Sequence, residues 1–120
     1  MESLVVDCEV RSEAVVVSAK GEVDSNTAEQ LVSQLNAALC QAAAHAERLL
    51  IIDLDELAYF GSAGLNAVLE CHQQGLEAGT PVRLIASNRI VVNPIEVTKL
   101  DKTLAVYRTY PDALQGRGDP

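Results

Sequence analysis

The spacing of hydrophobic residues changes several times along this chain, and each change predicts a different element. Near the amino end, apolar residues take every second position: Leu4, Val6, Cys8 and Val10. This alternation predicts a strand with one buried face. Residues 13–20 hold a continuous run of alanine and valine, which predicts a second and more central strand after a turn at Arg11 and Ser12. The two strands are expected to form an antiparallel hairpin.

Helical spacing follows a predicted loop at residues 21–26. The apolar positions then recur three and four residues apart: Ala28, Leu31, Val32, Leu35, Ala38, Leu39 and Ala42. This spacing predicts an amphipathic helix from Thr27. We expect Ser25 or Asn26 to cap it, because Glu29 follows Asn26 at the spacing of a capping box.

The centre of the chain predicts a strand, a tight turn and a second helix. Residues 48–54 contain a short continuous apolar run, which is typical of a strand covered on both faces. The second helix is expected over about residues 62–78, ended by the Gly-Thr-Pro sequence that follows. Its predicted apolar stripe consists of Leu65, Val68, Leu69, His72 and Leu76. Residues 82–86 predict a further strand.

Residues 88–103 allow two interpretations. Their apolar positions predict a helix that Pro94 kinks, because proline has no N–H to donate to the preceding turn. Alternatively, Asn93 caps a shorter helix with Pro94 in its first position and Glu96 reaching back. Residues 105–110 predict a last strand or extended edge.

This order of elements predicts an α/β fold in a single domain. We expect a mostly parallel, mixed central sheet of about four to five strands, with helices packed against it and an antiparallel hairpin at the amino end. Residues 1–113 are expected to form the domain and residues 114–120 a flexible tail. A chain of 120 residues is long enough for one such core.

Charge and cysteine content narrow the classes of function. Nine basic against 17 acidic residues give a net charge of −8, which opposes binding to nucleic acid or to anionic lipid. No secretory signal is visible and no apolar run approaches the ~20 residues of a membrane span, so we expect a cytoplasmic protein without direct membrane contact. Cys8, Cys40 and Cys71 lack a CxxC motif and favour buried thiols over a disulfide framework or a zinc site, with a redox role as the alternative.

Ser62 is the main candidate for chemistry. It stands where the second helix begins, so its hydroxyl is expected beside unpaired backbone N–H groups and the positive end of the helix dipole. Such a position accepts a phosphate well, although a serine there can also be a simple N-cap.

Other polar residues do not form a catalytic pattern. Asp53, Asp55 and Glu56 are close in sequence, but alternation along a strand sends neighbouring side chains to opposite faces. His45 and His72 show no spacing that implies a triad with serine and aspartate. We therefore expect no catalytic residue, no resident metal and no cofactor, and the protein is not expected to be an enzyme.

Two segments, read together, resemble the STAS domain, and specifically the bacterial anti-sigma-factor antagonists. Gly-Glu-Val-Asp at 21–24, followed by Thr-Ala at 27–28, is similar to the family's Gly-Glu-Leu/Val-Asp-x-x-Thr-Ala. Asp-Leu at 53–54 with Phe-Gly-Ser-Ala-Gly-Leu at 60–65 is similar to its Asp-Leu and Asp-Ser-Ser/Thr/Ala-Gly-Leu. Glu96 to Leu100 stands where Glu-Leu-Thr-Gly-Leu is usual. The chain departs from the pattern at Gly61 in place of aspartate, at Pro94, and at Lys99 in place of glycine.

The resemblance implies a regulator of transcription that switches partners. The unphosphorylated protein would bind an anti-sigma factor that carries a histidine-kinase-like serine kinase domain, and so release the sigma factor. That partner would phosphorylate Ser62 and end the binding, and a serine phosphatase would reset the site. The implied environment of the phosphosite or partner consists of Asp24, Asp53, Gly61, Ala63, Gly64, Leu65 and Asn66. We expect a monomer or a weak homodimer.

The same resemblance leaves a second function open. A non-switching STAS subunit of a larger assembly, such as a lipid-transport ABC system, has the motif Asp-Thr-Ala-Gly-Leu. The Ala-Gly-Leu sequence at 63–65 agrees with that variant. Loss of the aspartate at Gly61 also weakens kinase recognition, which favours the alternative.

Overall fold

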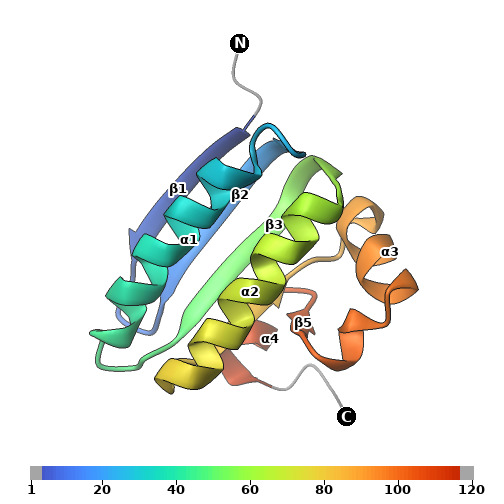
Figure 1. The fold of residues 1–120 in the computed structure, drawn as a ribbon. Helices are drawn as coiled ribbons and strands as arrows, with labels where there is room; N and C mark the ends of the chain where they lie inside the picture. The colour runs from blue at the N-terminus through green and yellow to red at the C-terminus, as the bar shows by residue number, and fades with distance from the viewer. Residues whose placement is uncertain (1–3, 117–120) are drawn as a thin grey trace.

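The computed structural model describes residues 4–116, which form a single five-stranded sheet flanked by helices (Figure 1). The strands are β1 (Leu4–Val10), β2 (Val15–Val23), β3 (Leu50–Phe60), β4 (Val82–Ile85) and β5 (Ala105–Tyr107). The helices are α1 (Ala28–Ala43), α2 (Ser62–Ala78), α3 (Arg89–Val97) and α4 (Tyr110–Gln115), with a 3-10 turn η1 (Leu100–Lys102). The strand order follows the chain, β1 is antiparallel to β2, and the other pairs are parallel. The predicted α/β fold with an amino-terminal hairpin is confirmed.

The sheet is covered on both faces, but unequally. Helices α1, α2 and α3 pack on one face and form the larger core, whereas α4 covers part of the other (Figure 1). Neighbouring residues of β3 illustrate the division, because Ile52 belongs to the larger core and Ile51 to the smaller one. Central parallel strands that are buried on both sides need continuous apolar runs, which explains the sequences of β2 and β3.

Both central strands are longer than the pattern of apolar residues predicts. β2 continues through the predicted loop to Val23, and β3 continues through the predicted tight turn to Phe60. Two register shifts in this pair each place one extra residue in β3. The buried positions of β3 therefore change from every second to every third residue, at Leu54, Leu57 and Phe60. A search for apolar residues at every second position does not detect a strand with this spacing. The predicted tight turn before α2 is therefore wrong.

The first strand and the first helix also depart from prediction. β1 lies at the edge of the sheet, and its predicted buried face is fully buried only at Leu4, while Val10 is 60% exposed. Helix α1 has Thr27 as its N-cap residue, without a side-chain cap bond. Capping by Ser25 or Asn26 is therefore wrong, because the preceding loop is organised by another side chain, described below.

Helix α2 has the predicted bounds but a different buried face. Small residues make up much of the buried face, which consists of Gly64, Leu65, Ala67, Val68, Cys71 and Gly75. Leu76, which was predicted on the buried stripe, is 66% exposed. The helix can lie this way because positions without long side chains allow it to approach the sheet closely. Gly79 then ends the helix in the left-handed conformation.

Helix α3 starts at Arg89, as the first of the two sequence interpretations requires. Asn88 is its N-cap, and the Asn88 side chain accepts a hydrogen bond from the Ile90 N–H at 3.0 Å. Pro94 lies inside the helix, so capping by Asn93 with Pro94 in the first position is wrong. The helix ends at Val97 instead of continuing to residue 103, and the chain turns at Lys99.

Lys99 has a left-handed backbone, with φ of 62° and ψ of 21°. Its Cβ crowds the following carbonyl in that conformation, whereas glycine adopts it without this penalty. We expect Lys99→Gly to raise the free energy of unfolding by about 1 kcal/mol, measured by urea denaturation. Lys102→Gly is the matched control, because Lys102 lies in the same segment without a positive φ and should not be stabilised. Equal effects of the two changes would contradict the explanation.

The carboxyl end of the described chain is helical rather than extended. Residues 114 and 115 complete α4, and the Arg83 side chain donates hydrogen bonds to the carbonyls of Ala113 and Leu114, at 2.8 and 3.2 Å. The rest of the predicted flexible tail, residues 117–120, lies outside the described residues. Among the described helices, none is both long and apolar enough to cross a membrane.

Candidate functional site

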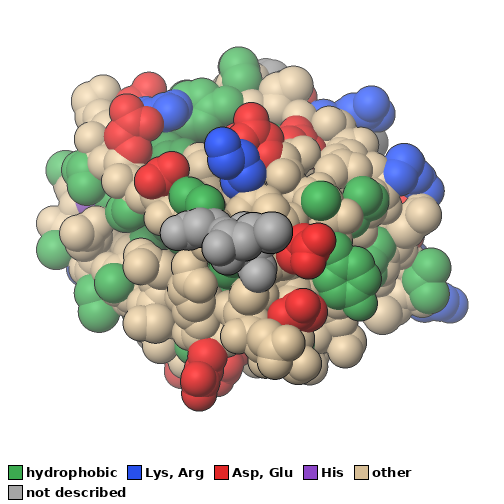
Figure 2. Space-filling model, turned by 90° about the horizontal axis from the view of Figure 1, so that it is seen from above, with side chains coloured by type: hydrophobic (Ala, Val, Ile, Leu, Met, Phe, Trp, Pro, Cys, Tyr) green, Lys and Arg blue, Asp and Glu red, His purple; other side chains and the backbone are tan. Residues whose placement is uncertain are grey.

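The amino ends of the three large helices meet at one end of the sheet. β2, β3 and β4 run in the same direction, and each leads at its carboxyl end into α1, α2 or α3 (Figure 1). Viewed from this end, the surface has acidic and basic side chains scattered among hydrophobic and uncharged ones (Figure 2). This end of an open α/β sheet is where such folds commonly place a functional site.

Ser62 is the first residue of α2, and its side chain is exposed. Gly61 precedes it as the N-cap residue, so the alternative that Ser62 itself is the N-cap is wrong. The first intrahelical bond runs from the Leu65 N–H to the Gly61 carbonyl at 3.0 Å. The N–H groups of residues 62–64 are therefore left without a helical partner beside the Ser62 hydroxyl. An anion attached to that hydroxyl would face these N–H groups.

Gly64 allows the amino end of α2 to pack closely against the sheet. A Cβ atom on Gly64 would lie 2.7 Å from Val23 Cγ1 and 3.0 Å from Phe60 Cε1. The Gly61 N–H also donates to the Val23 carbonyl at 3.0 Å, which fixes the start of the helix to β2. Ser62 is thus held on a rigid support by the buried residues around it.

The remaining residues of the motif divide between core and surface. Leu65 is buried and faces the larger core, Ala63 is half-buried, and Asn66 is exposed one turn after Ser62. Ser62 and Asn66 are four residues apart and therefore share one face of the helix. This face is the part of the motif that a partner can touch.

Tyr59 lies beside the turn that precedes Ser62, and the sequence patterns did not predict a role for it. The residue is 51% exposed, and its ring covers Gly61, where a Cβ atom would lie 3.0 Å from Tyr59 Cε2 and from the hydroxyl oxygen. An aspartate at position 61 would require this ring to move, although the backbone there suits any residue. Gly61 and Tyr59 thus fit one another. This contact depends on Tyr59 being part of β3, which follows from the pairing of β3 with β2 and not from the local sequence.

Asp24 shapes the loop before α1. Its carboxylate accepts hydrogen bonds from the N–H groups of Asn26 and Thr27, at 2.8 and 3.2 Å. The Thr27 hydroxyl donates to the Glu22 carbonyl at 2.9 Å. This is the Asx turn that organises the loop in place of the predicted cap. The hydrogen bonds of the Asp24 carboxylate in the described structure stay within this loop and do not reach α2.

Asp53 does not lie near Ser62 in the structure. It alternates with Ile52 and Leu54 of the larger core, so its side chain lies on the opposite face of the sheet from α2. Burial raises the pKa of the Asp53 carboxyl, and a hydrogen bond from the Asp55 N–H at 3.1 Å partly opposes that effect. The structure therefore places Asp53 outside the surface around Ser62.

Asp55 has a role that its sequence position did not reveal. The bulge in β3 directs its carboxylate to the N–H groups of Ser87 and Asn88, at 2.6 and 3.1 Å. The Asn88 side-chain amide in turn donates to the Leu57 carbonyl at 2.9 Å. These bonds fasten the start of α3 to the strand that leads into Ser62. Within residues 4–116, acidic, histidine and cysteine side chains form no group of three or more that could hold a metal ion.

The three cysteines are not alike. Cys8 and Cys40 are exposed, so the prediction of buried thiols is wrong for both, whereas Cys71 is buried in the larger core. Cys8 donates weakly to the Gln41 side chain at 3.4 Å. Burial raises the pKa of the Cys71 thiol from 9.0 to about 11. The protonated Cys71 thiol therefore makes its full contribution to the free energy of unfolding below pH 9.0. This contribution is lost as the pH rises through about 11.

We expect a thiol reagent at about pH 8 to label Cys8 and Cys40 in the folded protein and Cys71 only after unfolding. The Cys71 thiol is both inaccessible and protonated at that pH. Intact-mass spectrometry with and without denaturant counts the adducts. The control is Cys71→Ala, which should lose only the adduct that needs denaturant. Labelling of Cys71 as fast as that of Cys40 in the native protein would contradict this expectation.

Comparison with known proteins agrees with the fold and with the motifs. The STAS domain family model matches residues 5–113. Anti-sigma-F factor antagonist RsfB of Mycobacterium tuberculosis is 29% identical over 115 residues, which cover 96% of this chain and 90% of that protein.

Solved structures show the same relationship. An anti-sigma factor antagonist from Mycobacterium paratuberculosis is 30% identical, with a TM-score of 0.85 over 98% of this chain and 96% of that one. The phosphorylated form of the Bacillus cell fate determinant SpoIIAA shares the fold at 20% identity, with a TM-score of 0.66 over 92% of this chain and 97% of that one. The family model spans nearly all of the described residues, and both motifs occupy the matched region. The chain belongs to the STAS domain family.

Proposed function

We propose that this protein is an anti-sigma-factor antagonist controlled by phosphorylation of Ser62. In the unphosphorylated state it binds a cytoplasmic anti-sigma factor with a serine kinase domain, which releases the sigma factor. The observation that carries the proposal is the exposed Ser62 hydroxyl at the first residue of α2, in a chain similar over 96% of its length to an anti-sigma-F factor antagonist. The proposal gives this protein no catalytic activity of its own.

The start of α2 suits a phosphate on electrostatic grounds. The first turn contains no acidic residue, so no neighbouring carboxylate in that turn repels the added charge. A phosphate brings about −1.5 to −2 charges, which the free N–H groups and the helix dipole stabilise. Close packing at Gly64 holds the backbone in place in both states. The fold is therefore expected to be the same before and after phosphorylation.

The same charge is costly at a protein interface. A partner that packs against Ser62, Asn66 and Tyr59 would have to bury a dianion among groups arranged for a neutral hydroxyl. Like-charge repulsion and desolvation at such a contact cost several kcal/mol. Binding is then lost without any refolding of the antagonist, which is the physical basis of the proposed switch.

The direct test is phosphorylation by the partner. Incubation with the cognate anti-sigma factor and Mg-ATP should add one phosphate, which peptide mapping should locate on Ser62. Ser62→Ala should remove the modification, and Ser25→Ala is the matched control because Ser25 is also exposed at the same end of the sheet. A phosphate on Ser25, or none on any residue, would contradict the proposal.

One observation favours a second function, that of a non-switching subunit in a larger assembly such as a lipid-transport ABC system. Gly61 supplies no carboxylate beside Ser62, and the Tyr59 ring occupies the space where that side chain would begin. Affinity capture separates the two functions. A membrane ATPase among the captured proteins supports the subunit, whereas a soluble kinase-like protein supports the switch. A monomer or weak homodimer remains our prediction in either case.

A further inference from the structure

Tyr59 differs from the other aromatic residues of the chain, which all pack in a core. The chain has one phenylalanine, three tyrosines and no tryptophan. Phe60 belongs to the larger core, and Tyr107 and Tyr110 pack against the smaller one. Within residues 4–116, Tyr59 joins neither core, and it is exposed. Stabilisation by an aromatic side chain grows with the area that it buries, so this ring contributes comparatively little to the fold and is available to a partner.

Gly61 is the residue that makes room for this ring. Its backbone, with φ of −90° and ψ of −174°, is extended and suits any residue, so the conformation does not require glycine. The space does, because a Cβ atom there would lie 3.0 Å from Cε2 and from the hydroxyl oxygen of Tyr59, and 3.3 Å from Cζ. The hydroxyl end of the ring therefore lies over the residue that directly precedes Ser62. A side chain at position 61 would displace it.

The backbone that carries both the ring and the serine is held firmly. Tyr59 is paired with β2 near the end of β3, and Phe60, which follows it, is buried in the larger core. The Gly61 N–H donates to a β2 carbonyl at 3.0 Å, immediately before Ser62 begins α2. A partner that binds here meets groups on a preorganised support, which lowers the entropy cost of binding.

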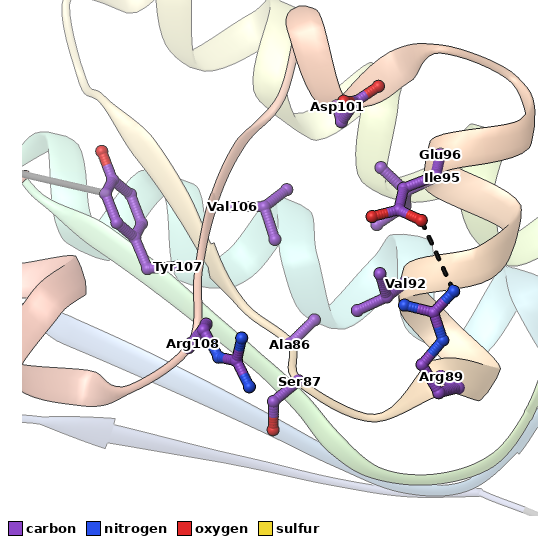
Figure 3. A pocket seen from close by; sticks show the side chains of 10 residues that line it. All are labelled: Ala86, Ser87, Arg89, Val92, Ile95, Glu96, Asp101, Val106, Tyr107 and Arg108. Atoms are coloured by element: carbon purple, nitrogen blue, oxygen red, sulfur yellow. Dashed lines mark ion pairs between the residues drawn. The ribbon is translucent and has the colours of Figure 1, made fainter. Parts of the chain in front are cut away.

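The ring lies outside the hollows of the described surface. A cavity of about 360 Å³ lies between α3 and the end of β5, and charged residues of both signs surround it, including the ion pair of Arg89 and Glu96 at 3.5 Å (Figure 3). Neither Tyr59 nor Ser62 is among the residues that line it, and two further cavities, of about 340 and 300 Å³, do not include them either. The recess that receives the ring must therefore belong to the partner.

We propose that Tyr59 is the specificity-determining contact for the partner that binds Ser62, and that its ring takes the place of the aspartate that this chain lacks at position 61. The partner is the anti-sigma factor, and its surface opposite Gly61 is an apolar recess without a basic side chain. Tyrosine suits this task, because it is among the residues that most often dominate binding energy at interfaces. The inference rests on the proposed function, since it needs a partner that docks on Ser62.

An uncharged contact at this point separates the antagonist from others that have the aspartate. A carboxylate placed in an apolar recess would lose its hydration without gaining a cation to pair with. A partner with a basic side chain at the same place would find no carboxylate at Gly61. The pair formed by Tyr59 and Gly61 therefore favours one class of partner and disfavours the other.

The test is calorimetric titration of the full chain with the purified cognate anti-sigma factor. Tyr59→Ala should weaken binding by at least about 30-fold, whereas Tyr59→Phe keeps the ring and should stay within about threefold of the parent. Leu76→Ala is the matched control, because it truncates an exposed apolar residue at the far end of α2 and should leave binding unchanged. Circular dichroism checks that each variant is folded.

Substitutions of Gly61 test whether it acts through the ring. Gly61→Asn displaces the ring without adding charge and should weaken binding about tenfold, and Gly61→Asp should weaken it about a hundredfold. In a chain that already carries Tyr59→Ala, Gly61→Asn should change the affinity by less than about twofold, because there is no ring to displace. Independent effects of the two substitutions would contradict the proposed pair.

Intact-mass measurement of phosphorylation in the same samples separates this inference from the proposed switch. If Ser62 is phosphorylated and Tyr59→Ala binds as tightly as the parent, the specificity contact is overturned and the switch stands. If the parent binds but gains no phosphate, the switch fails, while weakened binding of Tyr59→Ala still supports the contact.

Discussion

Ser62→Asp is expected to weaken binding of the anti-sigma factor by roughly a thousandfold, or about 4 kcal/mol. The added carboxylate would sit at the exposed start of α2, where an interface built around a hydroxyl must bury it. Ser62→Ala should bind as the parent protein does. Calorimetric titration of the purified proteins measures all of these affinities.

Two controls separate charge from size and from position. Ser62→Asn has the size of the aspartate variant without its charge, so its affinity should stay within about threefold of the parent. Ser12→Asp adds the same charge at the exposed β1–β2 turn, at the opposite end of the sheet, and should not weaken binding. If the asparagine variant lost as much affinity as the aspartate variant, the switch would be steric rather than electrostatic.

Gly64→Ala is expected to lower the free energy of unfolding by about 1–3 kcal/mol. The new methyl group would lie 2.7 Å from Val23 and 3.0 Å from Phe60, and both neighbours are buried. The better helix propensity of alanine, about 1 kcal/mol, offsets only part of this cost. Urea denaturation measures the change, and Asn66→Ala, at an exposed position of the same helix, should not be destabilising.

A second substitution tests the cause of this effect. Val23→Ala removes the methyl group that the new side chain would meet, at the cost of a small cavity. The double variant Gly64→Ala with Val23→Ala should therefore lose less stability than the sum of the two single losses, by at least about 0.5 kcal/mol. Strict additivity would show that Gly64 is not needed for the close approach of α2 to β2.

Much of this protein was predictable from local sequence patterns. The order of the five strands and of α1, α2 and α3 follows from apolar periodicity, as do the bounds of α2 and the exposed serine at its start, whereas η1 and α4 were not predicted. The two STAS motifs predicted the family that the comparison with known proteins confirmed. These features depend on interactions between residues close in the chain, which a single sequence records directly.

The sequence-based predictions are wrong where residues distant in the chain form the surroundings of a side chain. The bulges of β3 are set by its pairing with β2, and they carry Asp55 to the loop before α3. Which face of α2 is buried depends on the fit of Gly64 to Val23, rather than on the stripe of large apolar residues. Asp53 was predicted beside Ser62, but the alternation of β3 places it on the other side of the sheet.

The sequence by itself determined which elements form and which hydroxyl stands at the start of α2, because helix and strand periods and end signals are local. Only the tertiary structure decided which side chains lie around that turn: it placed the Tyr59 ring over Gly61 and Asp53 on the other face of the sheet. The physical reason is that strand register and helix packing join residues far apart in the chain, and no local pattern encodes those distances.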